Sequence, residues 1–410
     1  MISYVTRGRF DGVLWSLLVK RMAYKYLSKE VLIGFDKYQY SAVDTSPVSN
    51  YVSHPLWNSI VKVYPKWLAP NVLTLAGFLF IVANFIHLTY HDNYFYASDN
   101  THPEYAPVPQ WVWLVTAVFV FVAHVLDGTD GKQARRTNTC GPLGELFDHG
   151  LDSWAVSLLT ITVFSIFGRG DFSVGIERLF YLFLLTIYMF HITHWEKYNS
   201  GVLYLPWSYD ISQYGMVVIY LMTYYLGTGI WKFYVPGLTS VASGIVIEIS
   251  LYLGAIFLSV PLSLWNVYAA YSNGTGKSRS LLEGLRPGVP VVLCFGLFLW
   301  WVHTSPYEIL RQQPRLMLLA VSTVFSNMQT RLIVSCMSNT TCDAFNWLLL
   351  PLFMLVVGVQ TLSLGVTEVY LLWAYTLFVI AAHIHYGICV VRTRRSFHTK
   401  LVKFTSVDRF

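Results

Sequence analysis

Charged residues are scarce in this 410-residue sequence: they make up only 12% of it, whereas 55% of the residues are hydrophobic. A soluble globular domain carries about 25% charged residues. The deficit excludes an ordinary soluble protein, and a net charge of only +6 without a basic stripe excludes nucleic acid as a partner. The composition predicts an all-α, polytopic integral membrane protein surrounded by membrane lipids.

Cysteine is also rare, and the N-terminal segment favours an interfacial helix over a cleaved signal peptide. The five cysteines are scattered without a CxxC pair, which predicts free thiols and no redox motif. The apolar run 12–19 has eight residues and no small-residue cleavage site after it. We expect residues 1–37 to contain an amphipathic interfacial helix instead, with Tyr24, Leu27 and Val31 dipping into the headgroups.

Long apolar runs are abundant. About ten of them approach the length of about twenty residues that a helix needs to cross a bilayer. The fifth and seventh are the shortest. The predicted spans lie at about 70–90, 110–127, 149–168, 175–195, 211–228, 243–265, 288–304, 315–335, 345–364 and 368–391.

A polar stretch between the second and third runs holds four carboxylates, Asp127, Asp130, Asp148 and Asp152. Carboxylates next to hydrocarbon are costly, so they normally pair, bind a cation or face a wet cavity. The members of each pair are three or four residues apart, which places them on one face of a helix. The stretch is therefore the main candidate for a functional site.

The residue types in this stretch favour a hard metal ion and a phosphate. Four oxygen donors without cysteine, and with His149 as the one imidazole among them, suit Mg²⁺, Mn²⁺ or Ca²⁺ better than zinc. Shared carboxylates could bridge two such ions. Lys132, Arg135 and Arg136 lie between the pairs, where they would attract a phosphate or pyrophosphate. The site is thus predicted to bind a metal-bound phosphoanhydride.

The same stretch resembles the signature of the CDP-alcohol phosphotransferases. The pattern Asp-x2-Asp-Gly-x2-Ala-Arg-x8-Gly-x3-Asp-x3-Asp is filled without a departure by Asp127, Asp130, Gly131, Ala134, Arg135, Gly144, Asp148 and Asp152. The sequence that flanks this pattern resembles the choline/ethanolamine branch, and residues 150–154 and 194–198 are most similar to its ethanolamine-transferring members. The similarity extends over about residues 26–391.

The resemblance implies an enzyme that transfers phosphoethanolamine from CDP-ethanolamine to the hydroxyl of diacylglycerol, giving phosphatidylethanolamine and CMP. Mg²⁺ or Mn²⁺, as two ions, would be held by the four aspartates. The substrate-binding candidates are Asn71, Gly128, Gly131, Lys132, Arg135, Arg136 and Gly144. For the base that accepts the lipid proton we favour a Glu145–His149 pair over Asp152, the family's usual choice, because an imidazole is the side chain suited to proton transfer near neutral pH.

Several alternatives remain open at this point. The donor could be CDP-choline, or both CDP-alcohols, or CDP-diacylglycerol with a soluble alcohol. A cation-coupled transporter would also have ten spans with acids, but the acids gather at one membrane face rather than at its middle. A catalytically silent scaffold would be expected to have lost one of the aspartates, and none is missing.

We divide the chain into an interfacial segment (1–66), a catalytic core (67–228), additional helices (229–391) and a basic cytosolic tail (392–410). The additional helices would serve lipid access or contacts in a homodimer, and Glu248 within them either lines that access, joins the dimer or bonds a neighbouring helix. Lysine and arginine favour the loops on the side of the aspartates, which places that side in the cytosol. The resemblance implies the endoplasmic reticulum or Golgi membrane.

Overall fold

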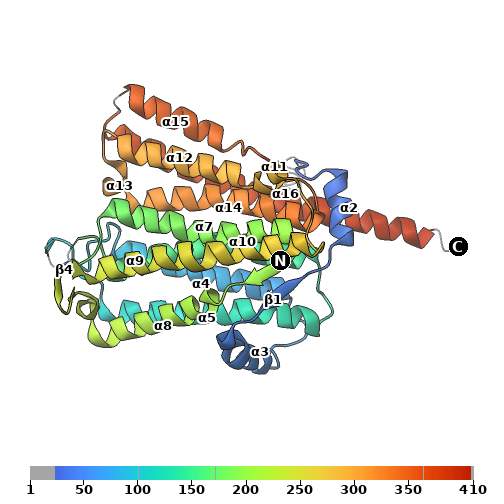
Figure 1. Ribbon diagram of the computed structural model, residues 1–410, viewed down its shortest axis with the longest axis horizontal. Helices are drawn as coiled ribbons and strands as arrows, with labels where there is room; N and C mark the ends of the chain where they lie inside the picture. The colour runs from blue at the N-terminus through green and yellow to red at the C-terminus, as the bar shows by residue number, and fades with distance from the viewer. Residues whose placement is uncertain (1–23, 100, 171, 363, 408–410) are drawn as a thin grey trace, which may run out of the picture.

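The predicted all-α architecture is confirmed in the computed structural model, which describes residues 24–99, 101–170, 172–362 and 364–407. Its long helices lie side by side along one direction (Figure 1). Among these described residues, seven helical segments are long and apolar enough to cross a membrane. They are α4 (Pro70–His91), α5 (Gln110–Arg136), α6 (Pro142–Phe167), α7 (Ile176–Ser200), the joined α9 (Ser243–Gly254), η3 (Ala255–Ser259) and α10 (Val260–Ser272), α14 (Pro314–Ser338) and α16 (Thr367–Val407).

Each of the ten predicted spans coincides with a helix. The three that are not among the seven are the fifth, seventh and ninth, where helices are shorter or more polar. They are α8 (Ser208–Leu226), α12 (Gly288–Thr304) and α15 (Leu349–Leu362). The protein is therefore a multi-pass membrane protein, and its spans were predictable from apolar runs of sufficient length.

Prolines and a glycine mark several helix ends. Pro70, Pro142 and Pro314 each occupy the first turn of their helix, where the missing N–H needs no partner. Helix α7 ends at Gly201, whose φ of +84° is left-handed and costs little without a side chain. Between α9 and α10 the helix widens into a π-turn next to Pro261, which cannot donate a backbone hydrogen bond.

Short elements cover the two ends of the bundle. At one end, β1 (Ala42–Asp44) pairs in parallel with β2 (Leu203–Leu205) and ties the N-terminal segment to the chain between α7 and α8. The other elements of this end are α2 (Lys29–Lys37), η1 (Ser49–Ser53), α3 (His54–Ile60) and α11 (Leu281–Leu285). The elements of the opposite end are η2 (Thr228–Trp231), β3 (Tyr234–Val235), β4 (Leu238–Ala242) and α13 (Ile309–Gln312).

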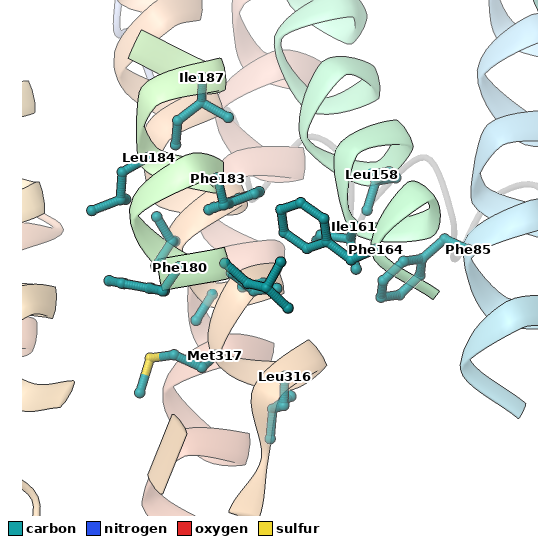
Figure 2. Packing of buried hydrophobic residues seen from close by; sticks show 14 of the residues in the cluster. Phe85, Leu158, Ile161, Phe164, Phe180, Phe183, Leu184, Ile187, Leu316 and Met317 are labelled. Atoms are coloured by element: carbon teal, nitrogen blue, oxygen red, sulfur yellow. The ribbon is translucent and has the colours of Figure 1, made fainter. Parts of the chain in front are cut away.

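Helix α14 forms the centre of the bundle. Most of its apolar stretch is buried, and it packs against α6, α7, α12 and α16. Figure 2 shows part of this packing, in which Phe180 and Phe183 of α7, Ile161 of α6 and Met317 of α14 belong to one buried apolar cluster. One apolar cluster therefore joins the predicted catalytic core to the additional helices, so the two regions share a core.

The N-terminal segment contains the helix α2, which Tyr24 and Leu27 precede, while residues 1–23 lie outside the described residues. Leu27 is buried and Tyr24 is exposed. Leu32 and Phe35 are also buried, in a cluster with residues of α14 and α16. Much of the apolar face of α2 thus packs against the protein.

Candidate active site

The acidic stretch lies on two helices at the end of the bundle that carries α2, α3 and β1 (Figure 1). Helix α5 continues through Asp127 and Asp130 to Arg136, nine residues beyond the predicted end of the span. After a turn, α6 begins at Pro142, so Asp148 and Asp152 also lie within a helix. Helix α4 packs against both α5 and α6. The two pairs of carboxylates therefore face one space.

The structure brings the predicted carboxylates together. Asp127, Asp130 and Asp148 each offer an oxygen within 4.8 Å of the others, and Asp148, His149 and Asp152 form a second group with the same spacing. Asp148 belongs to both groups. Within the described residues its buried Oδ1 has no hydrogen-bond partner. Hard oxygen donors gathered around an unpaired carboxylate oxygen fit a divalent cation, so the residues could hold a metal ion.

Neighbouring hydroxyl groups hold two of these carboxylates. The Tyr209 hydroxyl donates to Asp127 Oδ2 at 2.9 Å, and the Thr74 hydroxyl donates to Asp130. Tyr209 comes from α8 and Thr74 from α4. Two further helices therefore fix the orientation of the acids on α5.

His149 and Glu145 have different partners. His149 Nδ1 lies 3.4 Å from Asp152 Oδ2, whereas Glu145 Oε1 accepts from Lys197 Nζ at 2.6 Å and from the Tyr38 hydroxyl at 2.7 Å. Lys197 is only 3% exposed. Burial raises the pKa of Tyr38, and the charge of Glu145 raises it further, so the phenol stays protonated and remains a donor.

The three predicted substrate-binding glycines have different neighbours. A methyl group built on Gly144 would lie 3.7 Å from Asn71 Oδ1, so the start of α4 faces the start of α6. Gly131 has a similar neighbour in Arg135 Nη1, also at 3.7 Å from such a methyl group. At Gly128 the corresponding distance to Trp57 Cε2 is 2.2 Å, which means that the indole ring packs directly on this glycine.

The three predicted phosphate-binding cations are placed differently. Arg136 Nη1 donates to the backbone oxygens of Val61 at 2.8 Å and Tyr64 at 2.5 Å, which ties the segment after α3 to α5. Lys132 Nζ donates to Asn58 Oδ1 at 2.8 Å near the surface. Arg135 is exposed.

Sequence reasoning did not point to Tyr209, Trp57 or Tyr38 as neighbours of the site. Tyr209 and Trp57 come to α5 from α8 and α3, and Tyr38 follows α2. Their closeness depends on packing between distant segments, for which a single sequence carries no signal. Glu248 is explained by a contact that was one of its predicted alternatives: Arg178 Nε of α7 donates to Glu248 Oε1 at 3.0 Å.

The sequence is similar to a known protein family and to known proteins over most of its length. The protein-family model of CDP-alcohol phosphatidyltransferase matches residues 67–235. Human ethanolaminephosphotransferase 1 is 46% identical over 382 residues, which cover 93% of this chain and 95% of that protein. The mouse protein of the same name is 45% identical over 386 residues, covering 93% and 95% of the two chains.

A more distant relative is choline/ethanolaminephosphotransferase 1 of Arabidopsis thaliana. It is 27% identical over 387 residues, which cover 89% of this chain and 95% of that protein. The two helices that carry the acids, α5 and α6, lie within the residues that the family model matches. The chain therefore belongs to the CDP-alcohol phosphatidyltransferase family.

Proposed function

We propose that this protein transfers phosphoethanolamine from CDP-ethanolamine to diacylglycerol, giving phosphatidylethanolamine and CMP. The observation that carries the proposal is the convergence of Asp127, Asp130 and Asp148 within 4.8 Å at the family motif. Support for ethanolamine comes from relatives that carry this name at 45–46% identity. Family membership supports this enzyme over a transporter or a silent scaffold.

Four residues would hold Mg²⁺ or Mn²⁺, and two ions could share them: Asp127, Asp130, Asp148 and Asp152. Bound ions would neutralise charge on the pyrophosphate and stabilise the charge that develops on the leaving CMP. The chain itself orients these ligands through Tyr209 and Thr74. Asn71 and Gly144, which face each other at the starts of α4 and α6, are proposed to contact the nucleotide.

In the reaction, the lipid hydroxyl oxygen forms a bond to the phosphorus that bears ethanolamine. The bond from this phosphorus to the anhydride oxygen breaks, CMP leaves with the electron pair, and the hydroxyl proton passes to a base. We propose His149 as this base. With Nδ1 donating to Asp152, the lone pair on Nε2 can take the proton.

The proposed role of Glu145 is to support His149 rather than to take the proton alone. Its Oε1 already accepts hydrogen bonds from Lys197 and Tyr38, so two donors engage this oxygen. It lies one helical turn before His149 on α6. Lys132 and Arg135 are the cations proposed to reach the phosphates, since Arg136 is engaged with backbone oxygens.

We further propose that residues 67–228 form the catalytic core, that residues 229–391 serve lipid access or a homodimer, and that residues 1–66 and 392–410 are an interfacial segment and a basic tail. The bias of lysine and arginine supports a cytosolic site. A membrane of the endoplasmic reticulum or Golgi is proposed as the location, where diacylglycerol can reach the site laterally.

A transfer assay on the purified protein tests the function. Diacylglycerol and Mg²⁺ or Mn²⁺ are supplied with radiolabelled CDP-ethanolamine or CDP-choline in separate reactions. Labelled phosphatidylethanolamine that disappears with a chelator is the expected result. Product from both donors would make the enzyme dual in specificity, product from CDP-choline alone would reassign it to choline, and product from neither would refute the proposal.

A further inference from the structure

A second pair of carboxylates lies beside the proposed metal site. Asp44 of β1 accepts the Ser46 N–H at 2.9 Å and the Ser49 hydroxyl. Asp210, at the start of α8, is 4% exposed and accepts from the Ser53 hydroxyl at 3.1 Å. The serines that hold them, Ser49 and Ser53, are both on η1 about one turn apart, so the two carboxylates face the same short segment. Within the described residues, neither has a lysine or arginine nitrogen within 4.0 Å.

Two histidines face this pair without neutralising it. His54 Nε2 lies 3.8 Å from Asp44, and His124 Nε2 lies 4.0 Å from Asp210. His124 is 5% exposed, and neither of its nitrogens has a hydrogen-bond partner in the part of the chain that the structure describes. Burial lowers the pKa of His54, and Lys132 lowers it further, which keeps that imidazole neutral at neutral pH.

Aromatic rings enclose the same place. The Trp57 ring lies 5.4 Å from the His54 ring and 5.6 Å from the His124 ring, between centroids. The Tyr214 ring lies 5.1 Å from that of His124, and its hydroxyl lies 3.1 Å from Ser53 Oγ. A buried carboxylate without a cationic partner, here Asp210, is costly, and aromatic walls favour a cation. The chemistry calls for a small, positively charged hydrogen-bond donor.

The position of this cluster relative to the metal site suggests which cation. Tyr209, next to Asp210 in the chain, donates to Asp127 at 2.9 Å. His124 precedes Asp127 by three residues on α5, an axial distance of about 4.5 Å. A two-carbon amine whose phosphate lies at the aspartates reaches about that far. The cluster is therefore within range of the head group of a bound CDP-amino alcohol.

We infer that Asp210 and Asp44 bind the primary ammonium of the head group and thereby select ethanolamine over its N-methylated forms, an inference that rests on the proposed function. A primary ammonium donates three hydrogen bonds, which the two carboxylates and the His124 nitrogen can accept. Each N-methyl group removes one donor and adds volume. A quaternary amine leaves all three acceptors unpaired.

The test measures binding to the full chain in detergent with Mg²⁺, by isothermal titration. The ligands are CDP-ethanolamine, its N-methyl and N,N-dimethyl derivatives, CDP-choline, and CMP, which has no head group. We expect the affinity of the natural chain to fall along the methyl series. Asp210→Asn should weaken the binding of CDP-ethanolamine about ten- to a hundredfold and change the affinity for CMP by less than about twofold. The differences in affinity among the methylated ligands should become small in this variant.

The control is Asp36→Asn, which removes a carboxylate at the same end of the bundle. Asp36 pairs with Arg394 at 2.6 Å and lies on α2, so CDP-ethanolamine should bind as before. Asp44→Asn should also weaken the binding of CDP-ethanolamine while it leaves that of CMP nearly unchanged. This variant replaces Asp210→Asn in the test if Asp210→Asn does not fold.

Three outcomes would overturn the inference: an unchanged affinity of both asparagine variants for CDP-ethanolamine, an equal loss for CMP and CDP-ethanolamine, or a natural chain that binds the whole methyl series equally. The transfer assay separates these outcomes from failure of the proposed function. If the natural chain makes phosphatidylethanolamine while the affinity of the asparagine variants still falls with each added methyl group, the head-group inference alone is wrong.

Discussion

At the scale of single residues, Asp148 is the carboxylate that links the two acidic groups. Its buried Oδ1 has no partner within the described chain, and it lies within 4.8 Å of ligand atoms on both α5 and α6. We predict that Asp148→Asn lowers transfer at least a hundredfold, because the amide removes a charge that the metal needs. Steady-state transfer assays at equal protein measure this.

The control for that prediction is Asp343→Asn, whose carboxylate is 67% exposed and contacts Arg331. It should keep nearly full activity. A comparable loss in both variants, or activity of Asp148→Asn within threefold of the natural chain, would contradict a metal-binding role for Asp148.

The buried ion pair of Lys197 and Glu145 makes a prediction about stability. With side chains 3% and 9% exposed and atoms 2.6 Å apart, each charge depends on the other. Lys197→Met should cost about 3–5 kcal/mol because it leaves the carboxylate buried without its cationic partner. The double variant Lys197→Met with Glu145→Gln should recover much of this loss. Thermal unfolding in detergent, compared across the four proteins, measures it.

If the double variant were as unstable as Lys197→Met alone, the loss would come from packing of the long lysine side chain and not from the unpaired charge. The single variant Glu145→Gln completes the cycle and gives the coupling between the two residues.

At the scale of elements, the docking of α2 depends on one glycine. A methyl group on Gly34 would lie 2.1 Å from the backbone oxygen of Ser338 at the end of α14. We predict that Gly34→Val displaces α2 and lowers activity severalfold, because Tyr38, directly after α2, would lose its contact with Glu145. Limited proteolysis should detect earlier cleavage near α2 while the bundle stays intact.

Gly254→Val is the matched control, since a methyl group there meets nothing within 4 Å. This variant should resemble the natural chain in both measurements. If Gly34→Val behaved in the same way, α2 would not need its close approach to α14.

At the scale of the whole molecule, a bound cation should stabilise the fold. Carboxylates within 4.8 Å repel one another when charged, and an ion that binds only the folded chain adds stability by mass action. We predict that the melting temperature rises with Mg²⁺ or Mn²⁺ concentration, falls with chelator, and is insensitive to both in Asp127→Asn with Asp148→Asn. A response to metal that persisted in this double variant would place the ion elsewhere.

The membrane orientation gives a second prediction at this scale. Of the five cysteines, all within described residues, Cys140 alone is exposed, and it lies in the turn between α5 and α6 beside the site. If that end faces the cytosol, a membrane-impermeant maleimide should label intact cells poorly and permeabilised cells well, and Cys140→Ser should abolish the signal. Strong labelling of intact cells would reverse the orientation.

The sequence by itself determined the spans, the acidic motif and the family. Each of these depends on local patterns: apolar length sets a span, and spacing of three or four residues puts acids on one helical face. Only the tertiary structure decided that Glu145 pairs with Lys197 and Tyr38, that Trp57 covers Gly128 and that Asp44 and Asp210 both accept from serines of η1. These contacts join segments up to 157 residues apart in the chain, and they exist because packing of whole helices, not local propensity, brings the side chains together.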